Sequence, residues 1–149
     1  MVVNPGRMRS TNKLKPLTEE ERTRLLRAAI LVAPKAYVPY SKFRVGAAVL
    51  GEKGIYFGVN VENASYGLTL CAERSALSVA IAAGDKNIRA IAIASIDALT
   101  RDMRMPCGAC RQWMIELAPK AGILITGCDK PLTVEELIPH PFTPGNRNL

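Results

Sequence analysis

The chain has 149 residues and carries a formal net charge of +7, from 20 basic and 13 acidic side chains. Its length and its 48% hydrophobic content suit one folded domain with a core, and no apolar run is long enough to span a membrane. Because no signal-peptide pattern is present either, we expect a protein of the reducing cytoplasm with no membrane partner.

The first 17 residues differ from the rest of the chain in charge. They include Arg7, Arg9, Lys13 and Lys15 and no acidic residue, which leaves +3 on the remainder. We therefore predict a flexible basic tail over residues 1–17, followed by a single domain over residues 18–149. A solvated tail is the preferred interpretation, and attraction to nucleic acid or to another acidic surface is the alternative.

The remaining pattern predicts an alternation of helices and strands. Thr18 to Glu21 forms a capping box that opens a helix to about residue 33, where Pro34 ends or kinks it. The near-continuous apolar run 88–95 is typical of a central strand buried between two helical layers. The fold class is therefore α/β, with three α/β/α layers and a central mixed sheet of four to five strands. The other expected strands are 44–50, 55–60 and 122–126, and the other expected helices are 72–83, 107–117 and a short one after residue 133.

Three cysteines stand where predicted helices begin. Cys71 opens one helix, and Pro106 precedes the helix that holds Cys107 and Cys110. Unpaired N–H groups and the positive end of a helix dipole favour thiolate over thiol at such positions. Cys107 and Cys110 are three residues apart and project to one side, so both can reach one ion. Three thiolates suit zinc and leave a fourth position open, and Glu73 is near enough to shuttle protons.

Three other interpretations of these cysteines stay open from the residues alone. Buried thiols can be plain core residues, and a Cys-x-x-Cys pair can be a redox dithiol. A closed structural zinc site would add Cys128, which follows the predicted strand 122–126. The redox interpretation does not explain why a further cysteine and a carboxylate, Cys71 and Glu73, stand at the start of another helix. The closed site leaves Glu73 without a purpose. A catalytic zinc site is therefore the preferred hypothesis.

At these residues the chain resembles the cytidine deaminase family, small zinc enzymes that hydrolyse the exocyclic amine of cytidine and deoxycytidine. The resemblance covers about residues 18–142. It rests on the two cysteine blocks, Cys-Ala-Glu at 71–73 and Pro-Cys-Gly-Ala-Cys-Arg-Gln at 106–112, and on two further blocks at 36–48 and 60–66. Because it has a cysteine at position 71, where many relatives carry histidine, the chain resembles the three-cysteine, homotetrameric branch of the family.

The resemblance implies roles for particular residues. It implies one zinc ion per subunit on Cys71, Cys107 and Cys110, with Glu73 as the catalytic acid and base. Arg74 is implied to donate hydrogen bonds to cysteine sulfur and so to draw negative charge off the metal. The substrate-binding residues that it implies are Phe43, Asn60, Glu62, Tyr66, Ala72 and Phe142, with Phe142 acting either in its own subunit or in a neighbouring one.

The predicted function is zinc-dependent hydrolysis of cytidine and deoxycytidine to uridine and deoxyuridine with release of ammonia, a step of pyrimidine salvage. The implied partners are a small nucleoside substrate and further copies of the chain in a homotetramer with shared active sites. The alternative is a deaminase of polynucleotides or of modified or antibiotic nucleosides. Only 5% of the residues are aromatic, and they are not interleaved with basic ones as a nucleic-acid stacking groove requires. A non-catalytic zinc-binding module is the third hypothesis.

Overall fold

The computed structural model describes residues 15–144, which fold around a five-stranded mixed sheet with the strand order β2-β1-β3-β4-β5. Only β3 and β4 pair in parallel; the other three strand pairs of the described chain are antiparallel. The strands are β1 (Val45–Leu50), β2 (Ile55–Val59), β3 (Ala90–Ser95), β4 (Gly122–Ile125) and β5 (Leu132–Thr133). The helices are α1 (Glu19–Val32), α2 (Ala72–Ala82), α3 (Gly108–Leu117) and α4 (Val134–Leu137), with short 3-10 helices η1 (Ala33–Lys35), η2 (Tyr66–Leu68) and η3 (Asp102–Arg104).

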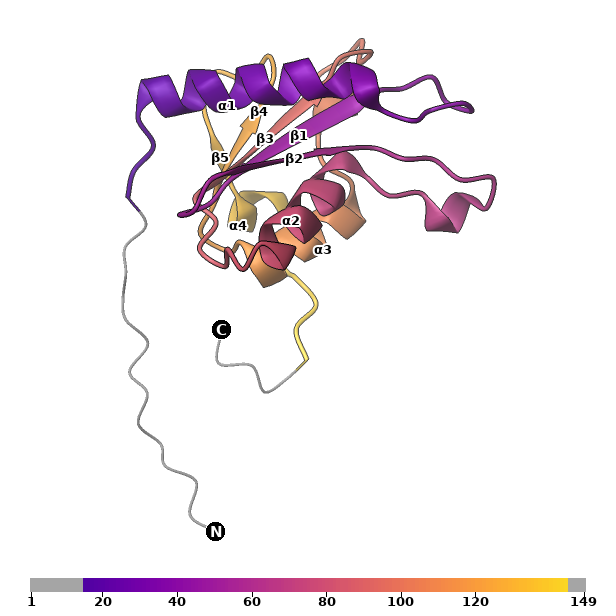
Figure 1. Ribbon diagram of the computed structural model, residues 1–149. Helices are drawn as coiled ribbons and strands as arrows, with labels where there is room; N and C mark the ends of the chain where they lie inside the picture. Colours follow the sequence, from indigo (N-terminus) through magenta and orange to yellow (C-terminus); the bar gives the residue numbers. More distant parts are fainter. Residues whose placement is uncertain (1–14, 145–149) are drawn as a thin grey trace.

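The sheet is the middle of three layers (Figure 1). Helix α1 lies across one face, and α2, α3 and α4 lie on the other. This confirms the predicted three-layer α/β/α class, and β5 supplies the fifth strand that the prediction of four to five allowed. β5 has two residues only, and its pairing with β4 places it at the edge of the sheet.

Helix α1 begins where its capping box predicts. The Thr18 hydroxyl accepts a hydrogen bond from the Glu21 backbone N–H at 3.1 Å, and the Glu21 carboxylate accepts one from the Thr18 backbone N–H at 3.0 Å. These two bonds satisfy donors that a helix start otherwise leaves unpaired. The helix ends at Val32, and the 3-10 turn that contains Pro34 follows directly.

Strand β3 is buried along its whole length, as its apolar run predicts. Ile91 and Ile93 pack in the core on the side of α2 and α3, where Ala76, Leu77 and Met114 also lie. The alternating alanines at 90, 92 and 94 face the other way and pack in a second cluster against α1. Since side chains alternate across a strand, large residues fill one layer while small ones let α1 approach the sheet closely.

An ion pair ties α1 to the start of β3. The Arg89 guanidinium donates to both carboxylate oxygens of Glu21, at 2.7 and 3.0 Å, and this pairing lowers the pKa of Glu21 to about 2. The same guanidinium contacts the carbonyl oxygens of Lys15 and Pro16. The last residues of the predicted tail therefore contact the domain, and residues 1–14 of that tail lie outside the described residues.

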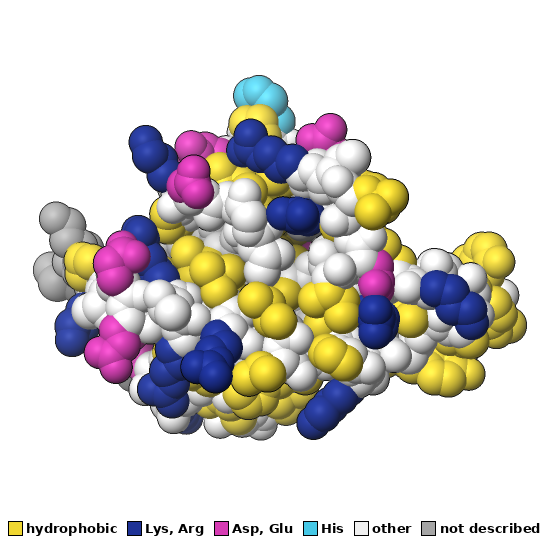
Figure 2. Space-filling view, turned by 90° about the horizontal axis from the view of Figure 1, so that it is seen from above, with side chains coloured by type: hydrophobic (Ala, Val, Ile, Leu, Met, Phe, Trp, Pro, Cys, Tyr) yellow, Lys and Arg dark blue, Asp and Glu magenta, His cyan; other side chains and the backbone are white. Residues whose placement is uncertain are grey.

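An arm projects from the domain beside the start of β1, on the right in Figure 1. Two segments form it, 36–44 and 60–70. An isolated bridge at Tyr37–Val61 joins them, and a second one at Val61–Leu70 joins the two ends of the segment 60–70. Hydrophobic side chains gather at its outer end in Figure 2, where Tyr66 and Leu68 are 77% and 70% exposed. Within residues 15–144 as a whole, no helix is long and apolar enough to cross a membrane.

Gly46 in β1 sets the distance between the sheet and α1. A methyl group at this position would overlap the carbonyl oxygen of Ala29 and the backbone nitrogen of Ala33. We expect Gly46→Ala to lower the free energy of unfolding by about 1–3 kcal/mol, because α1 must shift to make room. Denaturant unfolding of the purified variant measures this. Gly54→Ala is the matched control, since no atom lies within 4 Å of a methyl group there, and an equal loss in both variants would contradict the close approach.

Candidate metal centre

The amino ends of α2 and α3 meet at the carboxyl end of β3. Cys71 is the N-cap residue of α2 and Cys107 is the N-cap residue of α3, and neither side chain caps its own helix by a hydrogen bond. Cys110 lies in the first turn of α3 and is fully buried. All three thiols thus stand at helix starts, as the sequence predicts, and all three are free of disulfide bonds.

The spacing of the three sulfur atoms fits a metal. Cys107 Sγ lies 3.7 Å from Cys71 Sγ and 3.6 Å from Cys110 Sγ, and all three atoms lie within 4.8 Å of one another. Zinc–sulfur bonds of about 2.3 Å in a tetrahedron place the sulfurs about 3.8 Å apart. The donor set is soft and the count is three, which fits zinc with one position left for a water or a substrate.

Cys128 does not join this cluster. It lies beyond the end of β4, half-buried against the core, and the group of potential metal ligands found in residues 15–144 contains the other three cysteines alone. The alternative of a closed four-cysteine site is therefore not supported by the geometry. Near the cluster, Arg111 stabilises the start of α3. Its side chain donates to the carbonyl oxygens of Pro106 at 2.8 Å and of Leu137 at 2.9 Å.

Arg74 lies beside the sulfur cluster. Its Nη2 atom is 3.6 Å from Cys71 Sγ and donates to the carbonyl oxygen of Thr69 at 3.0 Å. Hydrogen bonding from Cys110, together with Arg74, lowers the pKa of Cys71 to about 5, against the opposing effect of burial. A cation and two helix amino ends therefore surround sulfur atoms that must be thiolates to bind a metal.

Glu73 is buried in the first turn of α2, with 4% of its surface exposed. Burial raises the pKa of Glu73 to about 7. Its side chain lines a cavity of about 180 Å³ together with Cys71 and Cys107. A carboxyl group that can change protonation near neutral pH therefore shares one small cavity with the sulfur cluster.

Three of the predicted substrate-binding residues also line this cavity, namely Phe43, Asn60 and Ala72. The side chain of Asn60 is engaged on both sides with the backbone near Phe43. Its Nδ2 donates to the Phe43 carbonyl oxygen at 2.8 Å, and its Oδ1 accepts from the Val45 N–H at 2.8 Å. In this structure Asn60 therefore holds the segment that carries Phe43.

The other three predicted substrate-binding residues lie outside the cavity. Glu62 is in the arm, where its Oε2 accepts from the backbone N–H groups of Tyr40 at 2.9 Å and Ser41 at 3.2 Å. Tyr66 lies at the outer end of the arm, with its ring edge-on to Tyr40. Phe142 is 75% exposed and lies along the groove between α2 and α3, where its carbonyl oxygen accepts from Gln112.

The cavity contains residues that the sequence analysis did not predict. Ser95 lines it from the carboxyl end of β3, a position at which α/β sheets commonly place their sites. Met103, Arg104 and Met105 line it from η3 and the turn that follows. Their signal in the sequence is their place directly before Pro106, but nothing local shows that this segment folds back over the cavity.

The chain is similar to known proteins over most of its length. A model of the cytidine and deoxycytidylate deaminase zinc-binding region matches residues 19–126. Cytidine deaminase from Halalkalibacterium halodurans is 45% identical over 133 residues, which cover 86% of this chain and 98% of that protein. Cytidine deaminase from Mycobacterium tuberculosis H37Rv is 42% identical over 115 residues, which cover 76% of this chain and 84% of that protein.

Solved structures show the same likeness. The crystal structure of cytidine deaminase from Burkholderia pseudomallei superposes with a TM-score of 0.72 at 41% identity, covering 85% of this chain and 100% of that one. Cytidine deaminase from M. tuberculosis gives a TM-score of 0.71 at 37% identity, with 81% and 96% covered. The family model is named for zinc binding, which agrees with the three-cysteine cluster and identifies the metal that it holds as zinc.

We expect one zinc ion per chain, lost in Cys107→Ala and kept in Cys128→Ser, because only the first substitution removes a member of the sulfur cluster. Elemental analysis of the purified variants measures the zinc content, and a thiol titration confirms the number of free cysteines. Loss of zinc in Cys128→Ser would contradict an open three-ligand site.

Proposed function

Because the chain belongs to the cytidine and deoxycytidylate deaminase family, we propose that it hydrolyses the C4 amine of free cytidine and deoxycytidine, which yields uridine or deoxyuridine and ammonia. The observation that carries the proposal is the meeting of Cys71, Cys107, Cys110 and Glu73 at one small cavity. The proposed role is pyrimidine salvage in the cytoplasm.

Zinc on the three cysteines supplies Lewis-acid chemistry that lowers the pKa of the attacking water. Glu73 takes one proton from that water and delivers it to N3 of the pyrimidine while the oxygen bonds to C4. Glu73 then moves the second proton from the new C4 hydroxyl to the exocyclic amine, which leaves as ammonia. One buried carboxyl group thus serves both proton transfers, and its burial keeps bulk water out of them.

Arg74 offsets the charge of the site. Three thiolates outweigh the charge of one divalent cation, which weakens its power to polarise a ligand. The guanidinium group near Cys71 Sγ draws electron density from that sulfur. We assign Arg74 this supporting role because its other hydrogen bond, to Thr69, holds it against the cluster.

The proposed substrate is a free nucleoside rather than a polynucleotide. Phe43 and Ala72 line the cavity and would contact the base, while Asn60 and Glu62 would bind the ribose. Hydrogen bonding with Ser41 holds the pKa of Glu62 below its usual range, so this carboxylate is negatively charged. A negative charge near the ribose disfavours a 3′-phosphate, and therefore an internal nucleotide of a strand.

We further propose a homotetramer in which Tyr66 and Phe142 complete the active site of a neighbouring subunit. Both side chains are more than 70% exposed and neither lines the cavity of its own chain. Large exposed aromatic rings are typical of protein interfaces. An aromatic ring brought from a neighbour would cover the base and exclude water from the proton transfers.

The direct test is a spectrophotometric assay of the purified protein with cytidine, deoxycytidine, cytidine 3′-phosphate and a cytosine-containing single-stranded oligonucleotide. We expect ammonia release from the two nucleosides and little from the other two compounds. Glu73→Gln should keep its zinc and its affinity for uridine while kcat falls by about 10²–10⁴-fold, the usual effect of losing a general acid and base.

Glu135→Gln is the matched control for the charge change, because Glu135 is exposed on α4 and does not line the cavity. It should leave the kinetics unchanged. Efficient deamination of the oligonucleotide would contradict the nucleoside proposal, and near-normal turnover of Glu73→Gln would contradict the role of the carboxylate.

A mixing experiment tests the shared site. Glu73→Gln and Phe142→Ala subunits are each expected to be impaired, and they are dissociated, mixed in equal amounts and reassembled. If Phe142 acts across an interface, some sites pair an intact Glu73 with a neighbour's intact ring, and roughly one quarter of the wild-type activity should return. Native mass spectrometry verifies the mixed tetramers.

Leu31→Ala is the control for removing an exposed hydrophobic side chain, since Leu31 is 66% exposed on α1 at the opposite face of the sheet. It should not impair activity. Activity of the mixture no higher than the mean of the two parents would place the action of Phe142 within its own subunit.

A further inference from the structure

An ion pair joins two segments that flank the cavity. Arg44 precedes β1 and Asp97 follows β3. The Arg44 side chain donates through Nη2 to Asp97 Oδ1 at 2.7 Å and through Nε to Asp97 Oδ2 at 2.9 Å. The backbone N–H of Arg44 also donates to Asp97 Oδ2, at 2.8 Å. One carboxylate therefore holds both the side chain and the main chain of Arg44, which fixes direction as well as distance.

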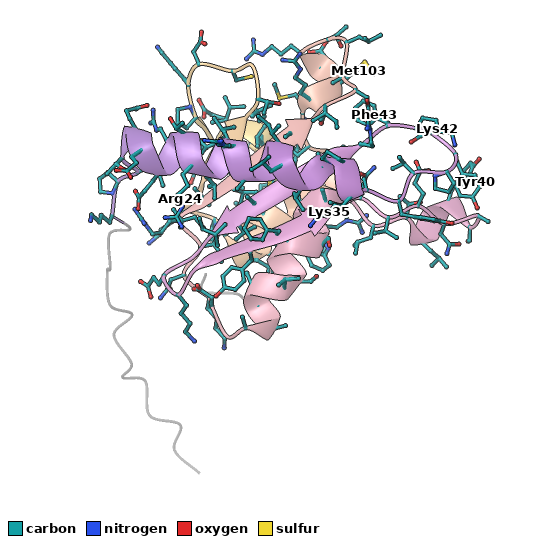
Figure 3. The ribbon with its side chains drawn as sticks, turned by 45° about the horizontal axis from the view of Figure 1, so that its top comes forward. Arg24, Lys35, Tyr40, Lys42, Phe43 and Met103 are labelled. Carbon is teal, nitrogen blue, oxygen red and sulfur yellow. The ribbon has the colours of Figure 1, made fainter. Side chains whose placement is uncertain are left out.

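This ion pair lies next to residues that line the cavity on both sides. Phe43 is the neighbour of Arg44, and Ser95 stands two residues before Asp97. Met103 follows on η3 and lines the same cavity. Figure 3 shows Phe43 and Met103 beside each other at this end of the molecule. The ion pair thus connects the segment that carries Phe43 to the segment that leads to Met103.

Phe43 is held from two directions. Its carbonyl oxygen accepts from Asn60, and the next peptide N–H, that of Arg44, donates to Asp97. Loss of Asp97 would remove the acceptor of the Arg44 backbone N–H and leave Asn60 and the nearby Ser41 hydroxyl as the only side chains, among the described residues, bonded to the backbone of 43–45. Loss of the Arg44 side chain would keep that backbone bond but remove the two side-chain bonds that hold Asp97 in place. The direction of the Phe43 ring therefore depends on a contact between segments 53 residues apart in the chain.

The ion pair is partly open to solvent, with 42% of the Arg44 side chain and 27% of the Asp97 side chain exposed. The Arg44 guanidinium lowers the pKa of Asp97 to about 2, so the carboxylate remains charged at neutral pH. Partly exposed ion pairs contribute little to the stability of a fold. The main effect of the Arg44–Asp97 ion pair is therefore to fix the position of Arg44, and its contribution to stability is secondary.

We propose that Arg44 and Asp97 are positioning residues of the active site, which set the placement of Phe43 against Met103 across the cavity and thereby the affinity for the nucleoside. This inference rests on the proposed function. Because Phe43 would contact the substrate before and during the reaction alike, its displacement weakens binding more than it slows the chemical step.

The chain contains a matched control for this ion pair. Arg89 and Glu21 form a second bidentate pair with the same 2.7 Å separation, at the opposite end of β3 from the cavity. Its arginine side chain is 13% exposed, so it is the more buried of the two. Removing Arg89 is therefore expected to destabilise the fold at least as much as removing Arg44.

The experiment compares Arg44→Met with Arg89→Met. Arg44→Met should raise the KM for cytidine about tenfold and weaken the binding of uridine, measured by calorimetry, by a similar factor, because a pocket residue has moved. Its kcat should change by less than about threefold. Arg89→Met should lower the midpoint of thermal unfolding at least as much as Arg44→Met does, and it should leave KM unchanged. Zinc content, measured in parallel, should stay the same in both variants.

Two further variants distinguish positioning from general damage. Arg44→Lys keeps the charge but not the two-pronged geometry, so it should recover part of the lost affinity. Asp97→Ala should raise KM at least as much as Arg44→Met, because it also removes the acceptor of the Arg44 backbone N–H. In the double variant the two effects on KM should not add, since both act through one contact.

An unchanged KM in Arg44→Met, or an equal rise in Arg89→Met, would overturn the positioning role. A wild-type protein that fails to deaminate cytidine would contradict the proposed function itself, which is a different result. Uridine binding is measured without turnover, so it reports the state of the pocket independently of the chemical step.

Discussion

The meeting of two helix amino ends at one edge of the sheet is the constraint on which the site depends. α2 leads into β3 through a short connection, so its amino end lies beside the carboxyl end of β3. α3 belongs to the crossover from β3 to the parallel strand β4, so it must begin at that same edge. The topology therefore explains why Cys71, Cys107 and Cys110 lie close together, because it brings the two helix starts to the same place.

The rest of the cavity is built from loops that side chains attach to the scaffold. Asn60 binds the backbone on both sides of Arg44, Asp97 binds Arg44 itself, and Arg111 binds the carbonyl oxygens of Pro106 and Leu137. These bonds satisfy backbone groups in loops or at the ends of β1 and α4, and each also limits how far a loop can move. The thiolates receive similar support from Arg74. Rigid strands thus set the site, and charged or amide side chains refine it.

Most of the fold was predictable because its signals are local. The capping boxes at Thr18 and Thr133 act over three residues, and the apolar run of β3 itself predicts that the strand is buried. Helix and strand ends accordingly agree with the predicted ranges to within about two residues. β5 was left open as a fifth strand, because a two-residue strand has no periodicity of its own and is defined only by its pairing with β4.

The sequence by itself determined the metal ligands and the neighbouring carboxyl group, because a cysteine at a helix start and a glutamate in the same first turn are placed by a few adjacent residues. Only the tertiary structure decided which distant segments meet around them. Met103 reaches the cavity through the fold of the 96–105 segment, and Arg44 finds Asp97 through the antiparallel register of β1 and β3. Phe142 was assigned to a pocket, yet in its own chain it lies along α2 and α3, outside the cavity. Contacts of this kind depend on strand register and on packing between layers, which no short stretch of sequence encodes.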